Sequence, residues 1–168
     1  MNYQKILLST AILAFSFHHS QNLKLNPTSA EERWKGYEQR KKLEENSILK
    51  NLEFRNVGPT TMSGRVTDID ANPENPTEFY VAYASGGLWY TNNNGTTFTP
   101  IFDREAVMTI GDIYVDWKTK TIFIGTGESN SSRSSYAGMG IYKSTDQGKT
   151  WQNLGLKDTH HIGRIVVN

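Results

Sequence analysis

Four carboxylates stand where acid–base chemistry could be done. Asp68, Asp70, Asp112 and Glu128 lie in or directly after short runs of residues with a strand-like pattern. Cleavage of a glycosidic bond normally needs two carboxyl groups, one on each side of the bond. These four acids are therefore the candidates for such a reaction, and Asp68, Asp112 and Glu128 are also candidates for ligand binding.

Arginines offer a second kind of chemistry, because the planar guanidinium group binds carboxylates through two hydrogen bonds. Arg65 and Arg164 stand near the starts of two strand-like runs, and we interpret these places as similar. Arg133 lies in a long polar segment. A bound anionic ligand is one reading, and an ion pair of Arg65 or Arg164 with Asp112 is the structural alternative, which we favour.

The segment "SNSSRSSYAG", residues 129–138, is the best functional candidate in the chain. Together with the preceding Glu128 it offers Asn130, Arg133 and Tyr136, a mixture suited to sugars or to a peptide backbone. Long loops on a rigid scaffold commonly carry recognition. The alternative is a serine-rich surface loop without a ligand.

Other kinds of site find little support. The chain has no cysteine, which excludes a disulfide framework, a thiol nucleophile and a thiolate metal site. His160 and His161 have no carboxylate at metal-ligand spacing, and we expect no metal and no cofactor. The 18 basic and 17 acidic residues nearly balance, with no basic run of the kind that binds nucleic acid.

A turn motif occurs twice, as "TNNNGTTF" (91–98) and "STDQGKTW" (144–151). The Asp or Asn can accept hydrogen bonds within its own turn, and the glycine can take the positive φ that a tight turn requires. The hydroxyl residues can satisfy other turn groups, and the aromatic ring can pack beneath the hairpin. We expect a structural role for the ten positions of the motif, which are Thr91, Asn93, Gly95, Thr97, Phe98, Ser144, Asp146, Gly148, Thr150 and Trp151. Neither copy has enough carboxylates for calcium.

The strands around this motif also repeat. Asp68 and Asp112 are 44 residues apart, whereas Thr91 and Ser144 are 53 apart, and residues 129–138 account for the difference. Each unit contains four predicted strands, at about 64–102 and about 109–156, and "IGRIVVN" near residue 161 resembles the opening of a third. A repeat of about 40–50 residues with four strands is typical of β-propeller blades, which close in rings of about 4–8. We therefore predict that the chain is the N-terminal fragment of a longer protein.

The region before the strands has two parts. Lys5 followed by the apolar run 6–17 is typical of a signal peptide, predicted for residues 1–20, because the run is shorter than the ~20 residues that span a membrane. The protein is then secreted, periplasmic or attached to the cell surface, with no membrane span after signal removal. Residues 21–51 are predicted to form a charged helical connector, loosely packed, with Ser29 and Glu32 spaced as a capping box.

The repeated motif is similar to the Asp-box, or BNR repeat, of sialidases, sortilin (VPS10-like) receptors and xyloglucanases. "FRNVGPTTMSGRVTDI", "ASGGLWYTNNNGTTFTPIFD" and "HIGRIV" further resemble bacterial secreted proteins with sortilin-like repeats that are often labelled glycosyl hydrolases. The resemblance implies an all-β fold, a β-propeller of which residues 52–168 contain two blades and the start of a third. The segment 52–57 is then expected to act as a ring-closing strand.

This repeat class contains enzymes, receptors and assembly factors, so the resemblance does not specify an activity. The xyloglucanases have a catalytic Asp shortly before a Gly-Gly pair, whereas this sequence has Ala84 and Ser85 before Gly86. We therefore expect a module that binds a glycan, or a protein or peptide, through loops between blades. The alternative is a glycoside hydrolase whose acids lie mostly beyond this fragment.

Overall fold

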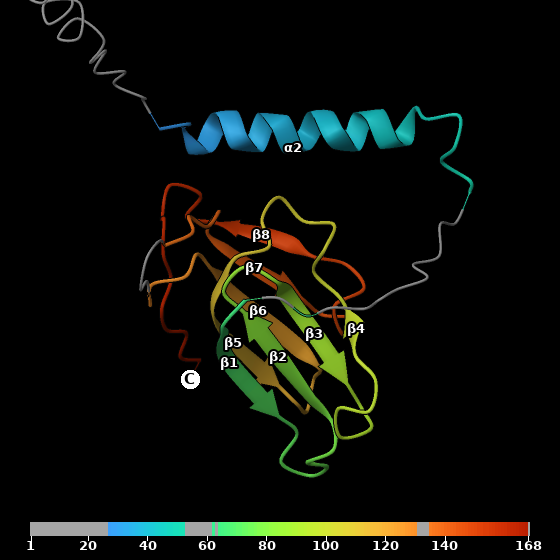
Figure 1. The fold of residues 1–168 in the computed structure, drawn as a ribbon, viewed down its shortest axis with the longest axis vertical. Helices are drawn as coiled ribbons and strands as arrows, with labels where there is room; N and C mark the ends of the chain where they lie inside the picture. The colour runs from blue at the N-terminus through green and yellow to red at the C-terminus, as the bar shows by residue number, and fades with distance from the viewer. Residues whose placement is uncertain (1–26, 53–61, 63, 131–134, 168) are drawn as a thin grey trace, which may run out of the picture.

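The computed structural model describes residues 27–52, 62, 64–130 and 135–167. Within these residues the chain forms one helix and two four-stranded antiparallel sheets, with α2 lying across one end of the sheets (Figure 1). The expectation of a β-rich fold preceded by a short helix is confirmed. The predicted signal peptide and nearly all of the expected closing strand, 52–57, lie outside the described residues.

Each sheet is a simple meander in which consecutive strands pair. The first sheet contains β1 (Val66–Ala71), β2 (Phe79–Tyr83), β3 (Gly87–Thr91) and β4 (Thr99–Pro100). The second contains β5 (Ile110–Asp116), β6 (Thr121–Thr126), β7 (Ile141–Ser144) and β8 (Gln152–Gly155). The order places β1 and β5 at one edge, here called the inner edge, and β4 and β8 at the outer edge.

The two sheets repeat one another down to an irregularity. The register of β1 against β2 shifts between Val66 and Asp68, and that of β5 against β6 shifts between Ile110 and Asp112. A bulge of this kind adds one residue to a strand and turns the residues on either side of it relative to each other. The sequence repeat of 44 residues along the inner strands is therefore also a repeat of backbone geometry.

The core lies between the sheets and along the second one. Many of its side chains are aromatic or β-branched, types that favour strands. The large hydrophobic side chains that are fully buried are Tyr80, Leu88, Phe102, Ile110, Ile122, Ile124, Met139 and Tyr142. Phe102, just after β4, packs edge-on against Tyr142 of β7 with ring centroids 5.1 Å apart. The segment between the sheets thus completes the core of the second sheet.

The helix α2 (Ala30–Glu45) begins with the expected capping box, because the Ser29 side chain accepts from the Glu32 backbone and Glu32 bonds back to Ser29. Most of α2 is exposed, as expected of a charged connector, and a few residues attach it to the sheets. Ala30 is buried, and Arg33 Nη1 donates to the Gly138 carbonyl at 3.0 Å. The sequence pattern misses this attachment because polar groups make most of it and α2 has no continuous apolar stripe.

Further contacts hold α2 to the sheets. The Tyr37 hydroxyl donates to Glu105 at 3.1 Å, and the ammonium group of Lys157 lies 3.5 Å from the centre of the Trp34 ring. Burial, and then the negative charge of Glu105, raise the pKa of Tyr37 to about 12. The helix therefore connects the segment after β4 with the segment after β8.

The segment 161–167 forms no strand in the structure, although the sequence resembles the opening of a third unit. Its backbone nevertheless bonds to the second sheet, since Ile162 N donates to the Thr126 carbonyl at 3.2 Å. Gly127, at φ 87°, provides the space for this segment, because a Cβ there would collide with the His160 carbonyl. The segment thus follows the inner edge of the second sheet.

Candidate functional site

The segment 129–138, here called the insert, leaves the sheet at the end of β6 and returns before β7. Glu128 and Tyr136 form an antiparallel bridge at its base, with Glu128 N donating to the Tyr136 carbonyl at 3.1 Å. The end of the two sheets where the insert and the β2–β3 loop lie is called the insert end. Arg133 lies outside the described residues.

Glu128 and Arg65 form an ion pair at the insert end. Arg65 Nη2 lies 2.6 Å from Glu128 Oε1, and the pair connects the start of β1 with the end of β6. The Glu128 side chain is fully buried and neither of its oxygens has a partner in hydrogen-bond geometry within the described residues, whereas the Arg65 side chain is 46% exposed. Arg65 therefore pairs with Glu128. From the sequence, Asp112 was expected to be the partner of Arg65 or Arg164.

The two acids of β1 bond to the backbone of the second sheet. Asp68 Oδ2 accepts from Ile113 N at 3.1 Å, and Asp70 Oδ2 accepts from Val115 N at 2.8 Å. Asp70 Oδ1 also accepts from the Trp117 indole at 2.7 Å. Both carboxylates thus connect neighbouring sheets, a role that the sequence pattern does not reveal because the partner is a backbone N–H group.

Asp112 makes the same kind of bond one unit later. Its Oδ2 accepts from Ile165 N at 2.5 Å, and its Oδ1 lies 3.9 Å from Arg164 Nη1, which confirms the expected pairing of Arg164. Burial raises the pKa of Asp112, and the neighbouring Asp68 carboxylate raises it further against the opposing effects of Ile165 and Arg164. The negative charges of Asp68 and Asp112 therefore act on each other at the inner edge.

Arg65 and Arg164 do not occupy equivalent places, contrary to the sequence interpretation. The Arg65 carbonyl accepts from Ala84 N as the Thr109 carbonyl accepts from Gly127 N, so Arg65 corresponds to Thr109. Arg164 precedes Ile165 as Asp112 precedes Ile113, and both isoleucine N–H groups bond to an Asp carboxylate. In terms of the second unit, Arg65 corresponds to position 109 and Arg164 to position 112, so the two arginines are three positions apart.

The remaining candidates are accessible. Tyr136 is 42% exposed, the Arg164 side chain is 79% exposed and Asn130 is exposed. A Cβ on Gly163 would lie 2.7 Å from the Ser129 hydroxyl, so the chain beside Arg164 lies against the insert. We call Arg65, Asn130, Tyr136 and Arg164 the insert-end surface.

The turn motifs lie at the opposite end of the sheets and satisfy their own polar groups. In the first copy, the Thr91 hydroxyl accepts from Gly95 N at 3.0 Å and Asn93 Oδ1 accepts from Thr97 N at 3.0 Å. Asn94 and Gly95 both have positive φ, 57° and 79°. The glycine therefore fits the backbone that the turn requires.

The second copy has the same geometry with a charged centre. The Ser144 hydroxyl accepts from Gly148 N at 2.8 Å, and Asp146 accepts from the Thr150 N–H at 2.9 Å and from its hydroxyl at 2.6 Å. The Thr150 hydroxyl and backbone, followed by Ser144, lower the pKa of Asp146 to about 2.

The aromatic residue of each motif packs differently. Trp151 donates its indole N–H to the Ile101 carbonyl at 2.8 Å and packs edge-on against Phe102, with ring centroids 5.0 Å apart. Phe98 packs against Phe79 of its own sheet at 6.1 Å. The Trp151 motif thereby anchors the segment that connects the sheets.

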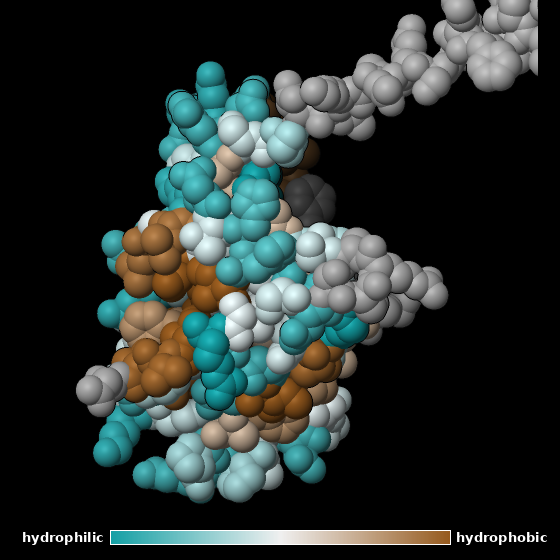
Figure 2. All heavy atoms as spheres, turned by 90° about the vertical axis from the view of Figure 1, so that its left-hand side faces the viewer, coloured by the Kyte–Doolittle hydropathy of each residue, from teal (hydrophilic) through white to brown (hydrophobic). Residues whose placement is uncertain are grey.

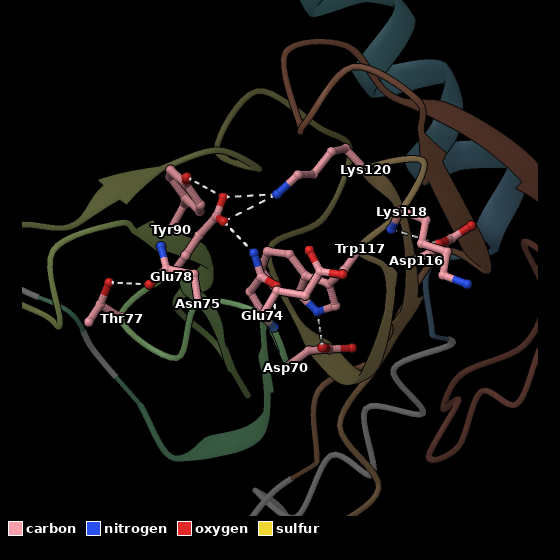
Figure 3. Close-up of polar contacts among 11 residues, drawn as sticks. Asp70, Glu74, Asn75, Thr77, Glu78, Tyr90, Asp116, Trp117, Lys118 and Lys120 are labelled. Carbon is pink, nitrogen blue, oxygen red and sulfur yellow. Dashed lines mark hydrogen bonds and ion pairs between the residues drawn. The ribbon is translucent and has the colours of Figure 1, made fainter.

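A polar cluster that the sequence analysis missed surrounds Glu78. Its carboxylate accepts from Asn72 at 2.7 Å, from the Tyr90 hydroxyl at 2.8 Å and from Lys120, which reaches across from the second sheet at 3.1 Å (Figure 3). Burial acts to raise the pKa of Glu78, but these donors outweigh it and lower the pKa. The cluster connects the β1–β2 and β5–β6 turns, and no spacing signal marks Glu78.

Within the described ranges, no three histidine or acidic side chains are grouped as metal ligands would be. The same residues contain no helix with the length and apolar character of a membrane span. No model of a known protein family matches the sequence, and no curated protein matches it.

Proposed function

We propose that the chain is part of an exported β-propeller of the Asp-box class and that its insert end binds a glycan or a peptide segment of another protein. The two sheets are the first two blades in this proposal. The observation that carries it is a repeated connection: Asp68 of β1 binds the backbone of β5, and Asp112 of β5 binds the backbone of the segment 161–167.

The exposed face of the first sheet supports a further neighbouring unit. Ile110 and Ile113 of β5, a strand that contacts β1 and β2 of the first sheet, are 0% and 4% exposed. Their counterparts 44 residues earlier, Val66 and Ile69 of β1, are 49% and 56% exposed. Figure 2 views the molecule from the left-hand side of Figure 1, the side on which β1 lies there, and shows hydrophobic patches on it. Packing of another blade there would bury them, as propeller architecture requires.

The chemistry of the insert-end surface supports ligand binding. Tyr136 offers a ring for stacking, Asn130 an amide and Arg164 a guanidinium group, and all three are exposed. These groups can bind hydroxyl, carboxylate or peptide groups. The Glu128–Tyr136 bridge fixes the backbone at the base of the insert, next to Asn130 and at Tyr136.

Binding is favoured over hydrolysis because the acids have other partners. Asp68, Asp70 and Asp112 accept backbone N–H groups, and Glu128 is buried beneath Arg65. A glycosidase needs one carboxyl group free to donate a proton and another free to act as base or nucleophile. These four carboxylates offer no such pair.

Glycan and peptide arrays probed with the purified protein test the proposal. We expect a ligand whose binding falls at least tenfold in Tyr136→Ala and in Arg164→Ala, with Lys118→Ala as the control on a distant turn. Retained binding in both variants would contradict the assignment to the insert end. Release of reducing sugar from a polysaccharide panel would favour the hydrolase instead.

A further inference from the structure

A groove opens at the outer edge, where the two sheets meet. One wall is the end of β4 and the segment after it, and the other is the second turn motif. The lining residues are Pro100, Ile101, Asp103, Arg104, Glu105, Gln147, Gly148, Lys149 and Trp151. Its volume, about 580 Å³, falls within the range of small-molecule sites, about 300–1,000 Å³.

The apolar side chains of the groove, Ile101 and Trp151, come from opposite walls and contact each other's segments. Trp151 is fixed by its hydrogen bond to Ile101 and by the edge-on contact with Phe102. A Cβ on Gly148 would lie 2.6 Å from the Ile101 side chain, so the turn is in close contact with the segment opposite it. A ligand would therefore meet a preformed aromatic surface.

Both walls of the groove carry polar side chains without internal partners. Asp103, Arg104, Gln147 and Lys149 line the groove, and none of these side chains forms a hydrogen bond or ion pair with another described residue. Glu105 differs, because it accepts from Tyr37 of α2. The acids of the inner edge are bound to backbone, whereas the polar groups of this groove remain free to bind something else.

The charges decide which class of ligand fits. Asp103 and Glu105 balance Arg104 and Lys149, so the groove attracts neither an anion nor a cation as a whole. An aromatic surface beside carboxylate, amide and ammonium groups complements a ring that has an apolar face and hydroxyl groups at its edge. We infer that this outer groove binds a neutral oligosaccharide, at a site separate from the insert-end surface.

The first turn motif provides a natural comparison. Thr96 occupies the place of Lys149, 53 residues earlier, and no described segment packs against that motif as 101–105 packs against the second. The groove thus depends on the junction of two units, and an isolated turn does not form it.

Binding to the purified protein can be measured by NMR with cellopentaose, xylopentaose, mannopentaose and laminaripentaose, following the indole N–H signals. We expect one of these sugars to shift the Trp151 signal. The double variant Asp103→Ala/Lys149→Ala should weaken that binding at least tenfold. Thr96→Ala is the matched control and should leave the affinity unchanged, and the circular dichroism spectrum checks that each variant is folded.

The results separate this site from the insert end. Tyr136→Ala should leave the affinity for the pentaose unchanged if the groove is the site. Binding that survives the double variant but is lost in Tyr136→Ala would overturn the inference while supporting the proposed function. Failure of all four sugars to bind, or binding of only peptides in the groove, would also overturn it.

Discussion

The carboxylate of Asp68 in β1 accepts a hydrogen bond from the backbone N–H of Ile113 in β5, 3.1 Å away, and so connects two sheets that share no strand ladder. Asp70 adds two bonds of the same kind, to Val115 and to the Trp117 indole. Hydrogen bonds to a charged acceptor are stronger than those between neutral groups. The contact between the sheets is therefore directional as well as apolar.

Replacement of Asp70 tests this connection. Asp70→Ala leaves the Val115 N–H and the Trp117 indole without their acceptor, at an expected cost of about 2–4 kcal/mol in the free energy of unfolding. Urea denaturation followed by tryptophan fluorescence measures the change. Asp158→Ala, in the turn after β8, is the control and should stay within about 0.5 kcal/mol of the native protein. Equal stability of the two variants would contradict the structural role of Asp70.

The second turn motif should make stability depend on pH in a way that the first does not. The pKa of Asp146 is about 2 when folded, below its ordinary value, so its contribution is present above about pH 4 and is lost as the pH falls toward 2. In Asp146→Asn, the fall in melting temperature between about pH 4 and pH 2 should be smaller than in the native protein. In Asn93→Asp, the fall in melting temperature over the same pH range should be larger than in the native protein, because the first turn has the same geometry. Superimposable profiles for all three proteins would be incompatible with this assignment.

The Arg65–Glu128 pair allows a double-mutant cycle. Arg65→Met leaves a buried carboxylate without its cation, and we expect a loss of about 1–3 kcal/mol, less than for a fully buried pair because Arg65 is half exposed. Glu128→Gln in the same chain should recover part of that loss by removing the charge. Additive effects of the two changes, measured by urea denaturation, would mean that the side chains do not interact.

Two glycine substitutions should have opposite effects. Gly127→Ala forces a Cβ into the His160 carbonyl at a positive φ, and we expect a loss of about 3 kcal/mol or more. Gly36→Ala lies in α2 with open space around it and should stabilise the protein by about 0.5–1 kcal/mol. Thermal melting of both variants checks the contrast, and a stable Gly127→Ala would refute the close packing of residues 160–163.

Much of the fold follows from local sequence rules. The capping box at Ser29 and the alternation around the turns predict the helix and the strands, since each signal depends on residues a few positions apart. The contacts of the site depend on residues far apart in the chain. Arg65 meets Glu128, and Glu78 meets Lys120, through the packing of one sheet on another, which no short pattern encodes. The role of Asp68 was also hidden, because its partner is a backbone N–H group that any residue would supply.

The strand β5 carries both halves of the connection between units: Ile113 supplies a backbone N–H to the preceding sheet, and Asp112 supplies a carboxylate to the following segment. A duplicated copy of such a unit would bring its own means of attachment on both sides. Gene duplication could therefore lengthen an array of these units without simultaneous mutations in the neighbours. The insert after Glu128 shows the complementary freedom, because the loop of one unit is longer while the connecting residues on its inner strand keep their spacing.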